Sequence, residues 1–149
     1  MVKRTIYPPV WLLLGLTTIF ACNEYFAGPR FTSTAGQVLG GVFLIIGLWL
    51  LVTAGGLFSR AKTGVIPFRN VSTLVTGGIY RYTRNPMYLG MSLVLLGCAV
   101  TVGASVALLV PPVFAIIIEL RFIRQEEVML RDIFPEQFAA YCGRVRRWI

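Results

Sequence analysis

The longest uncharged stretch of the chain covers residues 85–118, which are 34 in number. As one straight helix it would extend about 51 Å at ~1.5 Å per residue, whereas the hydrocarbon core of a bilayer is only ~30 Å thick. A tight turn near residues 101–104 would instead divide the stretch into two short helices. The sequence therefore predicts a helical hairpin in a membrane. Such a hairpin returns the polar residues on its two sides to the same membrane face.

The composition of the whole chain also indicates a membrane protein. It is 56% hydrophobic and 13% charged, with a mean hydropathy of +0.75, whereas a soluble domain is about a quarter charged. Two further uncharged stretches are each long enough for one membrane helix, which needs roughly 20 residues. We therefore predict an all-α integral membrane bundle that forms a single domain over residues 1–149. Its four transmembrane helices are expected at about residues 7–27, 36–58, 86–102 and 104–122.

The basic residues predict how these helices are oriented, because Lys and Arg are retained on the cytoplasmic side of short loops. Thirteen of the fourteen basic residues fall before the first helix, between the second and third, or from the end of the fourth onward, and only Arg30 does not. Both termini are therefore expected in the cytoplasm, with the protein in the cytoplasmic membrane. The net charge of +8 then reflects this asymmetry and contact with anionic membrane lipids. Nucleic acid is not an expected partner, since no soluble domain carries a basic face.

The segments outside the membrane are expected to be a cytoplasmic loop over residues 59–79 and a polar tail after Glu119. Apolar residues of the tail recur at helical spacing: Phe134, Phe138, Tyr141 and Val145. This pattern predicts an amphipathic helix over about residues 135–146, which begins at Pro135 and lies on the membrane. Two roles remain open for this helix. It either packs beneath the bundle or closes as a lid over the cytoplasmic ends of the membrane helices.

The sequence does not predict a metal site. The three cysteines, Cys22, Cys98 and Cys142, lie far apart without a CxxC pair, and the chain contains no histidine. A zinc site is therefore not expected. The absence of histidine also removes imidazole from the possible general bases.

The polar residues before the hairpin, GGIYRYTRNPMYLG at positions 77–90, have the features of a helix start. Pro86 is favoured in a first helical turn and restricts Asn85 to an extended conformation, so the third helix should begin there. The unpaired N–H groups of a helix start suit a carboxylate ligand. Nearby aromatic rings can attract a cation: Tyr80, Tyr82 and Tyr88. The alternative interpretation is an aromatic belt with arginine anchors at the membrane interface.

The polar residues after the hairpin include two adjacent glutamates, Glu126 and Glu127. Adjacent side chains on a helix point about 100° apart, so one carboxylate can face a pocket while the other faces solvent. Glu127 has the spacing of a surface ion pair with Arg131, which leaves Glu126 as the candidate for the inward position.

We call residues 77–90 and residues 121–130 the two polar clusters. In their order and separation they resemble the motifs of a family of integral-membrane methyltransferases. The family includes isoprenylcysteine carboxyl methyltransferase and the phospholipid N-methyltransferases. The resemblance covers residues 72–148, through STLVTGGIYRYTRNPMYLG, then EEVML, then FPEQFAAYCGRVRRW. Its specific feature is an Arg-(His/Asn)-Pro-x-Tyr-x-Gly element followed one hairpin later by a Glu-Glu pair.

The resemblance implies an S-adenosylmethionine-dependent methyltransferase that holds its cofactor at the cytoplasmic helix ends without a Rossmann fold. The family's cofactor contacts fall on Ser72, Thr73, Leu74, Val75, Tyr80, Asn85, Pro86, Met87, Tyr88 and Glu126. The methyl acceptor is expected to be lipophilic and to enter from the bilayer: a phospholipid amine, an isoprenoid-linked group or a small apolar acceptor. An amine must also lose a proton, and the catalytic candidates for accepting it are Glu126 and Glu127, besides a tyrosine or water.

Two positions depart from the prenylcysteine branch of the family. Asn85 replaces a histidine, and Phe122 stands where that branch has an arginine that contacts substrate. The nearest arginines, Arg121 and Arg124, are the candidates for substrate binding, although they project from other faces of the helix. A prenylcysteine carboxylate is therefore not the expected substrate.

Two other functions remain as alternatives. A small four-helix multidrug-type transporter would use Glu24 as its membrane carboxylate. Glu24 lies near the outer end of its predicted helix, where an interfacial residue is the simpler interpretation. A non-catalytic membrane scaffold of the same fold is the third possibility. The sequence does not predict the oligomeric state.

Overall fold

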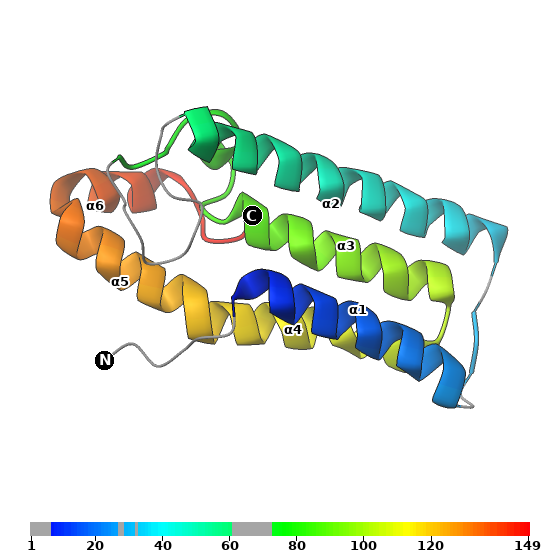
Figure 1. Cartoon of the computed structure of the whole chain (residues 1–149). Coiled ribbons are helices and arrows are strands. Elements are labelled where there is room, and N and C mark those ends of the chain that lie inside the picture. The colour runs from blue at the N-terminus through cyan, green and yellow to red at the C-terminus, as the bar shows by residue number, and fades with distance from the viewer. Residues whose placement is uncertain (1–6, 27–28, 32, 61–72) are drawn as a thin grey trace.

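The computed structural model describes residues 7–26, 29–31, 33–60 and 73–149, and these residues fold almost entirely into helices (Figure 1). Along the chain they form α1 (Pro8–Tyr25), α2 (Thr34–Arg60), the 3-10 helix η1 (Gly78–Arg81), α3 (Pro86–Val102), the 3-10 helix η2 (Ser105–Leu109), α4 (Val110–Ile118), the π-helical segment η3 (Glu119–Ile123), α5 (Arg124–Ile133) and α6 (Pro135–Arg144). Within the described ranges the one β-bridge joins Arg30 to Ala104. The prediction of an all-α fold is confirmed.

Two helical stretches are long and apolar enough to cross a membrane, Thr34–Leu57 and Ser105–Ile133. α3 is apolar along its whole length but has only 17 residues. The outer faces of the helices expose large aliphatic side chains. Leu13 on α1 is 62% exposed and Val52 on α2 is 74% exposed. Such surfaces suit contact with lipid far better than contact with water.

The predicted hairpin is present. α3 ends at Val102, and Gly103 adopts a left-handed conformation with a φ of 73° while its N–H donates to the Ala99 carbonyl. This glycine cap ends the helix and reverses the chain. The returning helix continues through η2, α4, η3 and α5 to Ile133 instead of ending near residue 122. Its 29 residues extend about 43 Å at ~1.5 Å each, so its polar end reaches beyond a ~30 Å hydrocarbon core.

Two pairs of glycines bring α2 and α3 into backbone contact. A Cβ atom added to Gly40 would lie 2.8 Å from the carbonyl oxygen of Gly97, and one added to Gly47 would lie 2.8 Å from that of Gly90. The two glycines of each helix are seven residues apart, so they lie on the same face of that helix and both contact the other helix. Small residues allow this close approach in membrane helices. The contact fixes α3, and therefore the start of α3, against α2.

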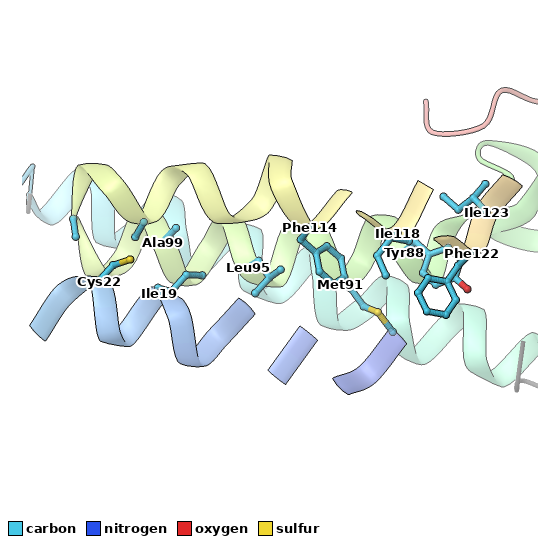
Figure 2. Close-up of a cluster of buried hydrophobic side chains, with 12 residues drawn as sticks. Ile19, Cys22, Tyr88, Met91, Leu95, Ala99, Phe114, Ile118, Phe122 and Ile123 are labelled. Atoms are coloured by element: carbon cyan, nitrogen blue, oxygen red, sulfur yellow. The ribbon is translucent and has the colours of Figure 1, made fainter. Parts of the chain in front are cut away.

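The main core lies between α1, α3 and the helix that returns from the hairpin (Figure 2). Ile19, Leu95 and Ile118 are completely buried there. Toward the polar end of the bundle, the same core includes Tyr88 and Phe122. The core therefore extends to the residues that the sequence singled out.

A second, smaller core lies beneath α6, where Phe138 and Tyr141 pack against Tyr80 and Ala54. α6 begins at Pro135 as predicted. The expectation that this helix rests its apolar face on the membrane is wrong, because that face is buried against the rest of the protein. The helix packs beneath the bundle on Tyr80 and Ala54, and a further role as a lid stays a prediction.

Candidate functional site

The two polar clusters meet at a hydrogen bond between Tyr88 and Glu126. Tyr88 lies in the first turn of α3, Glu126 lies in the first turn of α5, and the Tyr88 hydroxyl donates to Glu126 Oε1 at 2.7 Å. The Tyr88 side chain is only 7% exposed, and Glu126 is partly buried. The prediction that the hairpin brings the clusters together is therefore confirmed.

Tyr80 lies near the same carboxylate. It is held by η1, is 5% exposed, and its backbone carbonyl accepts a hydrogen bond of 2.6 Å from the Tyr141 hydroxyl. Burial raises the pKa of Tyr80 far above its ordinary value, and Tyr141 and Glu126 raise it further. The phenol is therefore neutral at physiological pH. Tyr82, by contrast, is 77% exposed and turned out of the site.

The backbone N–H groups at the start of α3 are a further feature of this region. Asn85 occupies the N-cap position without a side-chain cap hydrogen bond, and its Nδ2 atom instead donates to the carbonyl of Arg147 at 3.0 Å. Pro86 occupies the first turn, so the backbone N–H groups of Met87 and Tyr88 are the first that the helix presents. N–H groups in a first turn have no acceptor within their own helix. They suit a carboxylate, as the sequence predicted.

Glu127 is the more buried of the two glutamates, at 9% exposure. Arg147 donates to it twice, from Nε to Oε1 at 3.0 Å and from Nη2 to Oε2 at 2.7 Å, while Arg84 Nη2 lies 3.2 Å from Oε1. The expected surface pair with Arg131 is therefore wrong. The physical reason is that a carboxylate at this depth needs charged partners, and two arginines outside its own helix supply them.

The last residues of the chain return to the start of α3, and we call residues 145–148 the C-terminal clasp. The carbonyl of Arg146 accepts the N–H of Arg84 at 3.0 Å. Arg147 Nη1 and Trp148 Nε1 reach the two oxygens of Glu119 at 3.0 and 3.1 Å. With the contacts to Asn85 and Glu127, these bonds tie the chain terminus to both sides of the hairpin.

Other predicted residues fall in different surroundings. Leu74 and Val75 pack against the core around Tyr80, Thr73 is exposed, and Pro86 is buried. Ser72 lies outside the described residues. Arg121 and Arg124 are both exposed, and Arg124 lies 3.4 Å from Glu119. The surroundings of Tyr88 and Glu126 therefore contain Tyr80 but not Tyr82, and substrate binding by Arg121 and Arg124 stays a prediction.

The sequence interpretation assigned no role to the residues that hold the site in place: Thr83, whose hydroxyl accepts the Asn85 N–H at 3.1 Å, and Arg84, Glu119, Arg147 and Trp148. One signal could have indicated them. Five of the six acidic residues of the chain fall within residues 119–136, next to an arginine-rich ending. Carboxylates on a helix that leaves the membrane need partners, and the ending supplies three arginines close together, Arg144, Arg146 and Arg147.

No group of three or more His, Cys, Asp or Glu side chains is arranged to hold a metal ion in the described part of the chain.

A comparison with protein families agrees with the resemblance seen in the sequence. The family model described as "Phospholipid methyltransferase" matches residues 35–137, which are 103 of the 149 residues. The match contains α2 from its second residue, the hairpin, α5, Tyr88 and Glu126. No curated protein and no solved structure matches the chain. The chain therefore belongs to the phospholipid methyltransferase family of membrane methyltransferases.

Proposed function

We propose that the protein transfers a methyl group from S-adenosylmethionine to an acceptor carried by a membrane lipid, at the end of the bundle where Tyr88 and Glu126 meet. Family membership supports methyl transfer. The location of the proposed site is based on the 2.7 Å hydrogen bond from Tyr88 to Glu126. It joins the helix start, the aromatic residues and the carboxylate that the family resemblance assigns to the cofactor.

The residues present fit this cofactor chemically. Glu126 uses Oε1 for Tyr88, and its other oxygen is available to the ammonium or ribose hydroxyl groups of a ligand. The N–H groups of Met87 and Tyr88 suit a ligand carboxylate. Arg84 Nε is buried and has no acceptor among the described residues. A buried donor of this kind is costly unless it finds a partner, which an anionic ligand group provides.

Aromatic side chains fit the charge of the cofactor. When bound, S-adenosylmethionine supplies an activated methyl group on a positively charged sulfur. The buried rings of Tyr80 and Tyr88 can stabilise a cation by about 0.5–2 kcal/mol each, and burial of the site excludes water. Thr73, Leu74 and Val75 are further proposed cofactor contacts, together with Ser72, which is outside the described residues.

Glu126 is the proposed catalytic residue if the acceptor is an amine. Both oxygens of Glu127 are occupied by Arg84 and Arg147, so neither is free to accept a proton from a substrate. Glu126 keeps one oxygen outside its hydrogen bond with Tyr88. Glu127 then acts by positioning the C-terminal clasp and the start of α5.

We further propose that all four long helical segments cross the membrane as one domain, with both termini in the cytoplasm. α1 and α3 have 18 and 17 residues, about 27 and 26 Å at ~1.5 Å per residue, which is nearly the thickness of the hydrocarbon core. α1 packs against both α3 and α4. The exposed Arg121 and Arg124 would then lie at the cytoplasmic surface, where they can contact lipid phosphate.

The structure offers little support for a transporter. Glu24 is exposed at the end of α1, and the carbonyl of its neighbour Asn23 accepts a hydrogen bond of 2.8 Å from Arg30. Glu24 therefore occupies a polar helix end and not the interior of a membrane-spanning bundle. A transport function would instead need a carboxylate within the span.

Transfer of a labelled methyl group to lipid tests the proposal. Purified protein is incubated with methyl-labelled S-adenosylmethionine and a lipid extract, and the lipid fraction is counted. The wild type and Glu136→Gln, a matched change on the exposed first turn of α6, should label lipid, whereas Glu126→Gln should not. Absence of label with the wild type would favour the non-catalytic scaffold, and equal label with Glu126→Gln would contradict the assigned site.

A further inference from the structure

An elongated apolar groove runs between α1 and the helix formed by η2 and α4. It has a volume of about 340 Å³. Trp11, Leu14 and Cys22 line one side, and Val106, Leu109 and Val113 line the other. The α1 side runs from Trp11 to Cys22, which are 11 residues apart and therefore about 16 Å apart at ~1.5 Å per residue. The groove therefore has the elongated, apolar form that suits a hydrocarbon chain.

The rim of the groove belongs to the lipid-facing surface of the bundle. Leu109 is 63% exposed, Val113 is 53% exposed and Leu14 is 48% exposed. In a family of membrane methyltransferases, a surface of this kind is bathed by acyl chains. The medium that fills the groove is therefore hydrocarbon, and the question is whether one chain is held there specifically.

One residue of the lining has a polar atom without a partner, which points to such specific binding. The indole N–H of Trp11 is enclosed and has no acceptor in the part of the chain that the structure describes. The Thr18 hydroxyl, also in the lining, already donates to the Leu14 carbonyl at 2.8 Å. A buried indole N–H usually has a partner, because leaving it unpaired costs about 1–3 kcal/mol. The atom itself is enclosed, so a ligand carbonyl at the Trp11 end of the groove would supply the missing acceptor once the indole ring turns toward the groove.

The Trp11 end of the groove is also the end at which a lipid would place its ester groups. Trp11 is in the first turn of α1 and lines the groove together with Ile117, in the last turn of α4. The chain becomes polar two residues later, at Glu119. Tryptophan is favoured at this level of a bilayer, where its ring is in hydrocarbon and its N–H is near polar headgroup atoms.

We propose that the groove binds one acyl chain of a bilayer glycerolipid. The ester carbonyl accepts the hydrogen bond of Trp11 Nε1, and the end of the chain lies toward Cys22. The site depends on α1, which lies outside the residues 35–137 matched by the family model. None of the lining residues is among the proposed cofactor contacts, so loss of lipid binding and loss of cofactor binding can be distinguished.

Photo-crosslinking tests whether the groove holds a chain. The protein is reconstituted in phosphatidylcholine vesicles with a trace of phosphatidylcholine that carries a diazirine in one acyl chain, and the modified peptides are identified by mass spectrometry. Adducts should concentrate on residues 11–22 and 106–117 relative to the equally apolar outer face of α2. Adducts spread evenly over the exposed faces of α1, α2 and α4 would overturn the proposal.

Two matched tryptophan substitutions test whether filling the groove prevents binding of the chain. Val113→Trp places a large ring on the rim and should abolish the concentrated adducts, whereas Val52→Trp makes the same change on the α2 surface, at 74% exposure, and should leave them unchanged. The same loss of adducts is expected for Leu109→Trp, which replaces Val113→Trp in the experiment if Val113→Trp does not fold. Equal adduct patterns in the filled variants and in Val52→Trp would show that no chain is held.

Removing the donor tests the role of Trp11. Trp11→Phe keeps an aromatic ring in the groove but lacks the N–H, so it should lower the yield of groove adducts with the ester-linked probe. With an ether-linked probe, which has no carbonyl, the wild type and Trp11→Phe should give the same yield. A loss of the same size with both probes would contradict the assigned hydrogen bond.

Discussion

Arg147 donates two hydrogen bonds to the carboxylate of Glu127, at 3.0 and 2.7 Å, and thereby joins the end of the chain to the first turn of α5. The same guanidinium reaches Glu119 at 3.0 Å. One side chain of the C-terminal clasp therefore bridges the π-helical segment and the glutamate pair. It holds in place the helix turn that carries Glu126.

The first prediction concerns this bridge. Arg147→Ala leaves the buried Glu127 carboxylate with Arg84 alone, and we expect the free energy of unfolding to fall by about 2–4 kcal/mol, near the lower end for a broken buried ion pair because Arg147 is partly exposed. Arg146→Ala is the control, since only the backbone of that exposed residue is used. Thermal unfolding in detergent measures both. A loss of the same size in the two variants would show that the Glu127 pair does not stabilise the clasp.

A double-mutant cycle isolates the pair itself. If Arg147 and Glu127 stabilise the fold through each other, the combined variant Glu127→Gln with Arg147→Ala should lose less stability than the sum of the single losses. Interacting residues typically show coupling of about 0.5–3 kcal/mol. Additive losses would mean that the two residues act separately.

The second prediction concerns the contact between α2 and α3. A methyl group on Gly40 would lie 2.8 Å from the Gly97 carbonyl oxygen, whereas nothing lies within 4 Å of one on the adjacent Gly41. Gly40→Ala should therefore force the helices apart and cost about 1–3 kcal/mol. Gly41→Ala should be neutral or slightly stabilising, because alanine is the better helix former. Thermal unfolding measures the stability of both variants, and equal stabilities would contradict the observed packing.

The third prediction is a pH dependence. Burial raises the pKa of Tyr141 to about 12, although the positive charge of Arg84 opposes the rise. A tyrosine in the unfolded chain has a pKa of about 10, so the folded state holds the proton more tightly. Stability from this group is therefore complete below about pH 10 and is lost as the pH rises toward 12.

Tyr141→Phe should make this alkaline loss less steep, by at most about 1.4 kcal/mol per pH unit. A remaining slope is expected, because the pKa of Tyr80 is raised in the same direction. The variant should also be less stable at neutral pH, since it lacks the 2.6 Å hydrogen bond to the Tyr80 carbonyl. Unfolding midpoints between pH 8 and 11 measure the difference, and parallel curves for the two proteins would refute this account of Tyr141.

The fourth prediction separates the buried tyrosine from the exposed one. Tyr88→Phe removes the hydroxyl that orients Glu126, and a hydrogen bond to a charged group contributes about 1.5–3 kcal/mol. Binding of S-adenosylhomocysteine should weaken by tenfold or more. Tyr82→Phe makes the same change on a side chain that is 77% exposed and should bind as the wild type does. Equal affinities in the two variants would mean that Tyr88 does not serve the cofactor site.

The features that could be predicted from the sequence are those determined locally or by the bilayer. The hairpin follows from the length of an uncharged stretch, and the starts of α3 and α6 follow from Pro86 and Pro135. Because these features require the clusters to meet, the neighbourhood of Tyr88 and Glu126 was also predictable.

The partners of individual side chains could not be predicted in the same way. Helical spacing suggested Arg131 for Glu127, but the partners are Arg84 and Arg147, whose approach depends on the path of the chain after α6. Periodicity showed that α6 has an apolar face, yet it could not distinguish a membrane from the ring of Tyr80 as the surface beneath it. The π-helical segment before α5 has no counterpart in the hydrophobic pattern at all.

Calorimetric titration with S-adenosylhomocysteine most directly tests the central claim that both sides of the hairpin form one cofactor site. The account predicts that wild-type protein binds one ligand per chain and that Tyr88→Phe and Glu126→Gln each weaken binding. It also predicts that the double variant loses less than the sum of the two losses, because the residues act through a shared hydrogen bond. Wild-type affinity in either single variant, or no binding by the wild type, would contradict the claim.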